Sequence, residues 1–320
     1  MKKIGVLTSG GDAPGMNAAI RAVVRSGIYH GMEVYGIKHG YEGLIRGDIE
    51  ELKVYSVSDT LQRGGTILFT ARSKHFMEPE GIQRAIDMLE NFEIEGLVVI
   101  GGDGSLNGAL DLQKRGVKVM GLPGTIDNDL GYTDYTIGFD TAVNTVLGAI
   151  SNIRDTSSSH ERSTVIEVMG RNCGDLALYA GIAGGAETVL IPEIEPNINA
   201  ICKKLLEGKN RGKRHSVIIK AEGVKISTQE LAEVITQRTG LDTKVVVLAY
   251  IQRGGAPSCR DRMLASHMGC KAVELLKNGV YNRAIGVIGD EVIDYDLAEA
   301  LGMKRKMDNS LLEIAEILSI

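Results

Sequence analysis

Short apolar runs alternate along the chain with segments in which apolar residues recur every three to four positions. Runs of this kind, bounded by glycine or charged residues, predict buried strands, and the longer periodic segments predict amphipathic helices. Strands that alternate with helices predict parallel sheets joined by right-handed crossovers. The predicted strands are Ile4–Leu7, Val34–Ile37, Leu97–Ile100, Val117–Leu122, Val165–Val168, Val217–Ile219, Val245–Leu248 and Ile285–Ile288, and helical periodicity is clear in Ala19–Ile28, Ile82–Leu89, Thr141–Ile153 and Met263–Leu276.

The predicted strands are too many for one open sheet in a chain of 320 residues. We therefore expect an α/β protein with two lobes, whose boundary the sequence does not mark sharply. In such folds, ligands bind at the carboxyl ends of the strands. Most of the glycine-rich and charged clusters follow a predicted strand, so they are the candidate functional segments.

Composition narrows the function classes. A chain with 43% hydrophobic and 24% charged residues is typical of folded proteins, and its net charge of -5 argues against a nucleic-acid partner. The four cysteines are scattered without the paired spacing of a zinc site, and we expect them to be free thiols in a reducing compartment. The first apolar run, Ile4–Leu7, is too short for a signal peptide, and no later run is long enough to span a membrane, so we expect a cytoplasmic protein.

Two carboxylates stand two residues apart in the loop Pro123–Asp129, directly after a predicted strand. In an extended loop, Asp127 and Asp129 point the same way. Such a pair suits a bound cation, or a division of labour between a general base and a metal ligand. The alternative is that these are ordinary loop residues, because Asp and Asn commonly bond their own backbone.

Two glycine-rich segments also follow predicted strands. Gly101–Ser105 joins a strand to a helix, which is the arrangement that presents backbone N–H groups to a phosphate. Thr8–Asn17 does the same after the first strand, and a tight strand-to-helix turn is the alternative there. Thr8–Asn17 lacks both the Walker pattern and the dinucleotide glycine spacing, which disfavours a common P-loop kinase and a standard NAD enzyme.

Cations stand at several predicted strand ends. Arg72 follows Ile67–Phe69, which we expect to be a short strand, and a guanidinium there suits a transferring phosphoryl group. Met169–Arg171 and Tyr250–Gly255 place further arginines after two other strands. Together, the glycine loops, the cations and the carboxylates supply what phosphoryl transfer from a nucleotide requires.

Five loops together resemble those of bacterial ATP-dependent 6-phosphofructokinase, and the similarity covers nearly the whole chain. They are Thr8–Asn17, Gly101–Ser105, Pro123–Asp129, Met169–Arg171 and Gln252–Gly255. The resemblance implies an allosterically regulated enzyme of glycolysis that uses Mg-ATP to phosphorylate fructose 6-phosphate at the 1-hydroxyl, giving fructose 1,6-bisphosphate and ADP. It also implies two Rossmann-like αβα lobes with mainly parallel sheets and the active site in the cleft between them. The nucleotide-binding lobe would comprise residues 1–138 and 252–304, and the sugar-phosphate-binding lobe residues 139–251 and 305–320.

By the same resemblance, Asp127 is the general base for the 1-hydroxyl and Thr125 supports it, while Asp103 and Asp129 are ligands of Mg²⁺. The groups expected to stabilise the transferring phosphoryl are Arg72, Arg171 and the amide of Gly11. The implied ATP-binding positions are Gly11, Tyr41, Arg72, Ser73, Gly102, Asp103, Gly104, Ser105 and Gly108. The implied substrate-binding positions are Thr125, Ile126, Asp127, Arg162, Met169, Gly170, Arg171, Glu222, Lys244, Tyr250, Ile251, Gln252 and Arg253.

Arg21 and Arg25 stand four apart on one predicted helix face, which by default is a solvated surface. The resemblance instead places them in an effector site for ADP or phosphoenolpyruvate at a subunit interface. In the family, the residues at the positions of Arg162 and Lys244 come from a neighbouring subunit, so a homotetramer is expected. The implied effector positions are Arg21, Arg25, Arg154, Gly185, Glu187, Arg211, Lys213 and His215.

Two positions of the sugar-phosphate pocket depart from the family pattern, with Lys244 in place of an arginine and Tyr250 in place of a histidine. A related pyrophosphate-dependent enzyme typically carries Asp and Lys where this chain has Gly104 and Gly124. Two glycines leave room for a nucleotide and favour ATP.

A non-catalytic regulatory subunit is the alternative from a different class. The intact residues of the chemical centre argue against it, namely Asp103, Thr125, Asp127 and Arg171.

Overall fold

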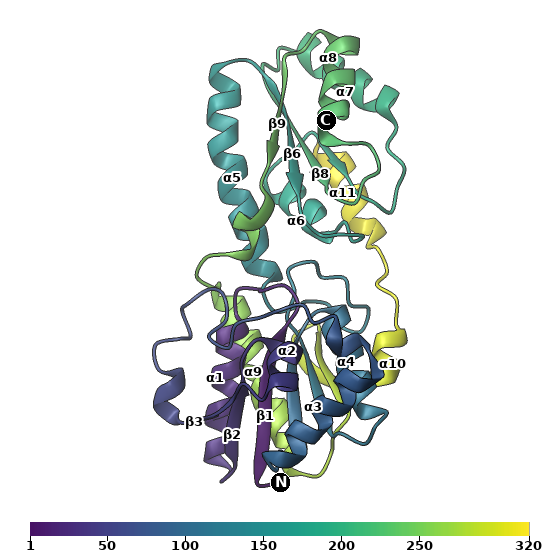
Figure 1. The fold of residues 1–320 in the computed structure, drawn as a ribbon. Coiled ribbons are helices and arrows are strands. Elements are labelled where there is room, and N and C mark those ends of the chain that lie inside the picture. The colour runs from purple at the N-terminus through teal and green to yellow at the C-terminus, as the bar shows by residue number, and fades with distance from the viewer. Residues whose placement is uncertain (320) are drawn as a thin grey trace. The chain divides into compact units, whose positions relative to one another are not determined.

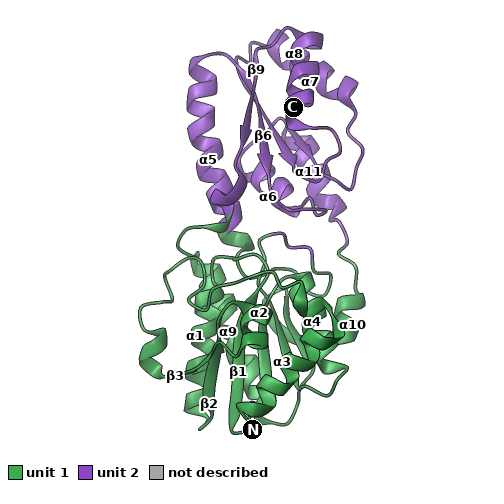
Figure 2. Cartoon of the chain, viewed as in Figure 1, with its two compact units in different colours: residues 1–126, 130–141, 253–305 green, residues 127–129, 142–252, 306–320 purple. Residues whose placement is uncertain are grey.

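A computed structural model describes residues 1–319, which form two compact units (Figures 1 and 2). Unit 1 comprises residues 1–126, 130–141 and 253–305, and unit 2 comprises residues 127–129, 142–252 and the described residues from 306 onward. The predicted lobes change over after residues 138, 251 and 304, whereas the units change over after residues 141, 252 and 305, and unit 2 also includes residues 127–129. Both units consist of mainly parallel sheets with helices, which confirms the predicted α/β class.

The sheet of unit 1 consists of β1 (Lys3–Ser9), β2 (Glu33–Ile37), β3 (Ile49–Leu52), β4 (Gly96–Gly101), β5 (Val119–Pro123), β10 (Arg283–Ile288) and β11 (Glu291–Asp296). Its order is β11-β10-β5-β4-β1-β2-β3. The five inner strands are parallel, and the two edge strands pair antiparallel with their neighbours. The central strands β4 and β5 are buried throughout, as expected for parallel strands that are covered on both faces.

The helices of unit 1 are α1 (Met16–Tyr29), α2 (Gly40–Arg46), α3 (Pro79–Asn91), α4 (Asp103–Gln113), α9 (Cys259–Lys277) and α10 (Leu297–Gly302), with short 3₁₀ helices η1 (Val54–Val57) and η2 (His75–Met77). On one face of the sheet, α1 and α9 pack closely. The absence of a side chain at Gly269 permits this approach, since a Cβ there would lie only 2.6 Å from the Cβ of Ala22. On the other face, α2, α3, α4 and α10 contribute to one buried apolar cluster (Figure 1).

Unit 2 contains the strands β6 (Ser163–Val168), β7 (Thr188–Leu190), β8 (Ser216–Ala221) and β9 (Thr243–Val247). They form a fully parallel sheet with the order β7-β8-β6-β9. The remaining helices are α5 (Phe139–Ser159), which starts in unit 1, α6 (Asp175–Ala183), α7 (Ile198–Asn210), α8 (Thr228–Thr239), the 3₁₀ helix η3 (Ala249–Arg253) and α11 (Asn309–Leu318).

All eight predicted strands and the four predicted helical segments are present, whereas β3, β7 and β11 were not predicted. The expected strand at Ile67–Phe69 is wrong, because Phe69 has a φ of 57°, which ends an extended backbone. Within residues 1–319, no helix is both long and apolar enough to cross a membrane.

The buried carboxylate of Asp261 connects the first turn of α9 to the start of α5. It accepts hydrogen bonds from the backbone N–H groups of Gly138, at 2.9 Å, and Thr141, at 2.8 Å, and from the Thr141 hydroxyl. Ser258 caps α9 by accepting from the backbone N–H of Asp261 at 3.2 Å, and its own hydroxyl donates to Asp140 at 2.6 Å. Burial raises the pKa of Asp261 to about 6.

We expect Asp261→Asn to destabilise the protein by about 1–3 kcal/mol. The side-chain NH₂ group of Asn would replace a carboxylate oxygen and face a backbone N–H group, so that one hydrogen bond would be lost. A raised pKa in the folded state means that protonation of Asp261 favours folding. As the pH falls from 7.5 to 5, the free energy of unfolding of the wild-type protein should therefore increase by about 1.4 kcal/mol relative to that of the variant. Urea unfolding at both pH values measures this difference, with the exposed Asp290→Asn as the control. A stability gap that stays constant or narrows at pH 5 would contradict the assignment.

Candidate active site

The loop between β1 and α1 lies against Arg253 in unit 1. Gly10 and Gly15 have φ values of 84° and 109°, in the left-handed region that favours glycine. A Cβ at Gly11 would lie 2.5 Å from Nη1 of Arg253, which donates to the carbonyl of Asp12 at 3.2 Å. Two predicted site residues, Gly11 and Arg253, are therefore in close contact.

The second glycine-rich turn starts α4, whose N-terminus favours anions. Asp103 is exposed as its first residue, and its Oδ1 accepts from Nδ2 of Asn107 at 3.1 Å. A Cβ at Gly104 would meet no described atom within 4 Å, whereas one at Gly124 would lie 3.0 Å from Cγ2 of Ile100. Of the two glycines predicted to leave room for a nucleotide, only Gly104 has open space beside it.

Tyr41 of α2 packs beneath the first turns of α4. Its hydroxyl donates to the carbonyl of Ser105 at 2.6 Å, and a Cβ at Gly108 would lie 2.8 Å from its ring. Burial raises the pKa of Tyr41 well above its ordinary value. The structure thus brings together three predicted ATP-binding positions, and the neutral tyrosine hydroxyl fixes the start of α4.

Arg72 lies in a loop and not at the end of a strand, which corrects the expectation above. The loop is anchored on its amino side, where the Thr70 hydroxyl donates to the carbonyl of Gly10 at 2.7 Å. The exposed Arg72 therefore lies close to the first glycine-rich loop within unit 1.

Asp127 is 1% exposed, and one of its carboxylate oxygens lies 3.2 Å from Nε of the half-exposed Arg171. Two neighbours adopt left-handed conformations, with φ values of 52° at Asn128 and 51° at Arg171. Side chains hold both, because Asn128 donates to Asp175 at 2.9 Å and the backbone N–H of Arg171 donates to Glu222 at 3.0 Å. Strained backbone of this kind is common at functional sites and persists only where contacts enforce it.

The buried Gln252 completes this cluster in unit 2. It accepts from the backbone N–H of Met169 at 3.0 Å and donates to the carbonyl of Ala249 at 2.9 Å. Predicted substrate residues thus gather at the carboxyl ends of β6 and β8, namely Met169, Gly170, Arg171, Glu222 and Gln252.

Arg162 and Lys244 lie at the other end of the same sheet, by the amino ends of β6 and β9. Both bind one carboxylate, since Asp242 lies 2.8 Å from Nε of Arg162 and 2.9 Å from Nζ of Lys244. Tyr250 and Ile251 are exposed. Within unit 2, Arg162 and Lys244 are therefore not brought to the cluster around Arg171.

The predicted effector residues of unit 2 gather around β7 and β8. Arg154 donates to the carbonyl of Gly185 at 2.8 Å, and Lys213 lies 2.6 Å from a carboxylate oxygen of Glu187. A cavity of about 260 Å³ is lined by Glu187, Arg211 and Lys213. Nε2 of the neighbouring His215 is buried with no hydrogen-bond partner among the described residues.

The two predicted effector arginines of unit 1, Arg21 and Arg25, are partly buried on α1. Nε of Arg25 is buried and has no hydrogen-bond partner within residues 1–319.

A sequence profile described as Phosphofructokinase matches residues 3–276 of this chain. The chain belongs to the phosphofructokinase family. It is 58% identical over 320 residues to the ATP-dependent 6-phosphofructokinase of Alkaliphilus metalliredigens, and 58% identical over 319 residues to that of Clostridium botulinum strain Loch Maree. Both comparisons cover the whole of this chain and of the relative. The resemblance indicated by the five loops is confirmed, and the chain is an enzyme of this family.

Solved structures of the family show the same fold. The phosphofructokinase of Pichia pastoris in the T-state aligns with a TM-score of 0.91 and 37% identity, over 99% of this chain and 37% of that chain. The phosphofructokinase of Saccharomyces cerevisiae aligns with a TM-score of 0.89 and 36% sequence identity. This alignment covers 100% of this chain and 48% of that chain, so this chain spans about half of it. A pyrophosphate-dependent phosphofructokinase from Nitrosospira multiformis, at 21% identity and a TM-score of 0.87 over 99% of this chain and 91% of that one, shares the fold alone.

The sequence did not reveal the acidic partners of the loop residue Asn128 or of the predicted site residues Arg162 and Lys244. Asp175 holds the loop residue Asn128, and Asp242 bridges Arg162 and Lys244. Only Asp242 left a local signal, because it stands two residues before Lys244. The other contact joins residues that are distant in the sequence.

Gly223 provides a test of the loop around Arg171. A Cβ at this position would lie 1.9 Å from the carbonyl oxygen of Arg171, so Gly223→Ala must displace the loop. Because a displacement of about 1 Å can cost about a hundredfold in rate, we expect a fall in turnover of that order. The control is Gly148→Ala on α5, where a Cβ would meet no described atom within 4 Å. Turnover of the Gly223→Ala variant at the wild-type level would contradict the described loop geometry.

Proposed function

We propose that this chain transfers the γ-phosphoryl group of ATP to the 1-hydroxyl of fructose 6-phosphate, giving fructose 1,6-bisphosphate and ADP. The observation that carries the proposal is the buried Asp127 carboxylate, held 3.2 Å from Arg171 in a chain 58% identical to enzymes named ATP-dependent 6-phosphofructokinase. A carboxylate fixed in this way is suited to accept the proton of an attacking hydroxyl.

In this mechanism, Asp127 removes the proton from the 1-hydroxyl as that oxygen attacks the γ-phosphorus. Thr125, two residues before Asp127, supports this base, and its own backbone is held because the Thr136 hydroxyl donates to the carbonyl of Thr125 at 2.6 Å. Arg171 and Arg72 neutralise the charge that is spread over the transferring phosphoryl oxygens, and the backbone N–H of Gly11 donates to them.

Asp103 and Asp129 would hold Mg²⁺, which when bound neutralises the negative charge of the nucleotide phosphates. Their carboxylate oxygens are the hard donors that this cation prefers. Within residues 1–319, no group of three or more His, Cys, Asp or Glu residues could hold a metal ion. The two carboxylates of Asp103 and Asp129 fit Mg²⁺, because this cation is usually held by one or two carboxylates together with substrate phosphates.

We also propose that the active enzyme is a homotetramer in which neighbouring copies complete the sugar-phosphate site. The position of Arg162 and Lys244 supports this, because they lie at the opposite end of the unit 2 sheet from the cluster around Arg171. Two cations held together by Asp242 are well placed to bind the 6-phosphate in the site of another copy.

Asp127→Asn preserves the shape of the side chain but cannot accept a proton. We expect turnover to fall by about 10²–10⁴-fold, the range of general base catalysis, with little change in sugar-phosphate binding. A coupled assay with ATP, Mg²⁺ and fructose 6-phosphate measures this change, and Asp87→Asn on the exposed face of α3 is the control. Near-wild-type turnover in the Asp127→Asn variant would refute the role of this residue.

We further propose that ADP or phosphoenolpyruvate binds at the effector residues and regulates the enzyme. Arg211 and Lys213 line a cavity of about 260 Å³. Lys213 is held by the carboxylate of Glu187, and Arg154 is held by the carbonyl of Gly185. A phosphate group would satisfy cations of this kind through charge-assisted hydrogen bonds.

Replacing both Arg21 and Arg25 by Ala should abolish the shift that ADP or phosphoenolpyruvate causes in the fructose 6-phosphate saturation curve. Coupling between such sites typically changes affinity by about 5–150-fold, and the variant should show almost none of that change. Its maximal rate should persist, because neither arginine has a part in the chemical step. The exposed pair Arg84 and Arg115, changed to Ala, is the matched control. An effector response equal to that of the control would reject this site.

A further inference from the structure

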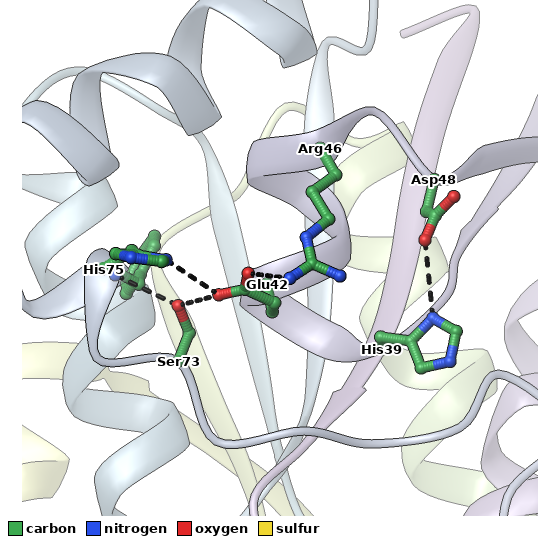
Figure 3. A network of polar contacts seen from close by, with 7 residues as sticks. His39, Glu42, Arg46, Asp48, Ser73 and His75 are labelled. Atoms are coloured by element: carbon green, nitrogen blue, oxygen red, sulfur yellow. Dashed lines mark hydrogen bonds and ion pairs between the residues drawn. The ribbon is translucent and has the colours of Figure 1, made fainter.

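Two adjacent residues of α2 reach two different segments of the proposed ATP site. Tyr41 bonds to Ser105 in α4 and stacks on Phe76, with ring centroids 4.0 Å apart and 15° between the planes. Glu42 reaches the loop that carries Arg72, where the Ser73 hydroxyl donates to its Oε2 at 2.7 Å (Figure 3). The short helix α2 therefore connects α4 with the arginine loop.

The hydroxyl of Ser73 is used inside the protein. A serine hydroxyl has one proton, and here that proton goes to Glu42. The same oxygen accepts from the backbone N–H of Phe76 at 3.1 Å. The predicted ATP-binding position Ser73 therefore has its hydroxyl proton committed to the carboxylate, and this bond shapes the loop.

Glu42 is well held for this task. Its side chain is 13% exposed, Nη2 of Arg46 lies 2.6 Å from its Oε1, and Nδ1 of His75 lies 3.6 Å from its Oε2 (Figure 3). The hydrogen bond from Ser73, followed by the charge of Arg46, lowers the pKa of Glu42. An ionised acceptor makes the bond to Ser73 one of the stronger kind.

The helix that carries Glu42 is itself fixed. A Cβ at Gly43 would lie 1.6 Å from the carbonyl oxygen of Lys38, so α2 approaches the end of β2 more closely than any other residue would permit. The backbone N–H of Asp48 donates to the carbonyl of Gly43 at 2.8 Å, and the Asp48 carboxylate lies 3.5 Å from Nδ1 of His39 (Figure 3). The carboxylate of Glu42 therefore projects from a rigid support.

Arg72 lies between two anchors of the same loop. On its amino side, Thr70 is bonded to Gly10, and on its carboxyl side, Ser73 is bonded to Glu42. We infer that Glu42 is a positioning residue that holds Ser73, and through it Arg72, in the conformation that receives ATP. This inference rests on the proposed function. Loss of Glu42 would release the carboxyl-side anchor and leave the other in place.

The test compares Glu42→Ala with Glu42→Gln, Ser73→Ala and the double variant Glu42→Ala/Ser73→Ala. We expect Glu42→Ala to raise the KM for ATP about tenfold and, because Arg72 also acts on the transferring phosphoryl group, to lower kcat as well, with half-saturation by fructose 6-phosphate little changed. Glu42→Gln keeps an oxygen acceptor for Ser73 and should restore most of the affinity. Ser73→Ala should match Glu42→Ala, and the double variant should be no worse than either. The control is Glu50→Ala, which removes the surface ion pair with Lys38 at 2.7 Å and does not affect the loop.

Three results would overturn the inference: an unchanged KM for ATP in Glu42→Ala, a fall in kcat alone, or additive effects in the double variant. The second would show that Glu42 makes no contribution to ATP binding. Calorimetric titration of each variant with MgATP, without sugar phosphate, separates this inference from the proposed function. A wild-type chain that binds MgATP but does not phosphorylate fructose 6-phosphate would refute the proposed function, while the ratio of Kd values would still decide the role of Glu42.

Discussion

Parallel strand pairing is the constraint on which the proposed site depends. In unit 1 the register places Ser9 of β1 opposite Gly101 of β4, and Gly101 opposite Pro123 of β5. Three loops that are far apart in the sequence therefore leave the sheet at one edge. In unit 2 the pairing of Val168 with Ala221 does the same for the loops after β6 and β8. The polar contacts of each cluster follow from that placement.

Most of the strands that could be predicted from the sequence have apolar runs that record burial on both faces, although β9 is partly exposed. Two of the three missed strands carry a different pattern, because β3 contains Glu50 and Glu51 and β11 is rich in acidic residues. Both are antiparallel edge strands exposed on one side, where charge is expected and an apolar run is not. The wrongly expected strand at Ile67–Phe69 shows the converse. Leu68 is apolar because it is buried, while a left-handed Phe69 prevents the backbone from continuing as a strand.

The loops of the candidate site could be predicted because glycine and aspartate signal their chemistry locally. Their supporting contacts could not, since these depend on which helix packs beside which loop. The bond between Glu42 and Ser73 joins residues 31 positions apart, and that between Asn128 and Asp175 joins residues 47 apart. Gly124 illustrates the same limit, because its lack of a side chain serves packing against Ile100 and not an open space.

The strand order of unit 1 also governs how the nascent chain is exposed during synthesis. β5 pairs with β4 on one side and with β10 on the other, yet β10 begins only at Arg283. The ribosome must therefore translate every strand of unit 2 before that partner emerges. Throughout this interval the outer edge of Val119–Pro123 is an unpaired apolar strand edge, which can pair with another chain. The length of unit 2 thus sets how long a newly made molecule is open to aggregation, and a slower ribosome on those codons would lengthen that exposure.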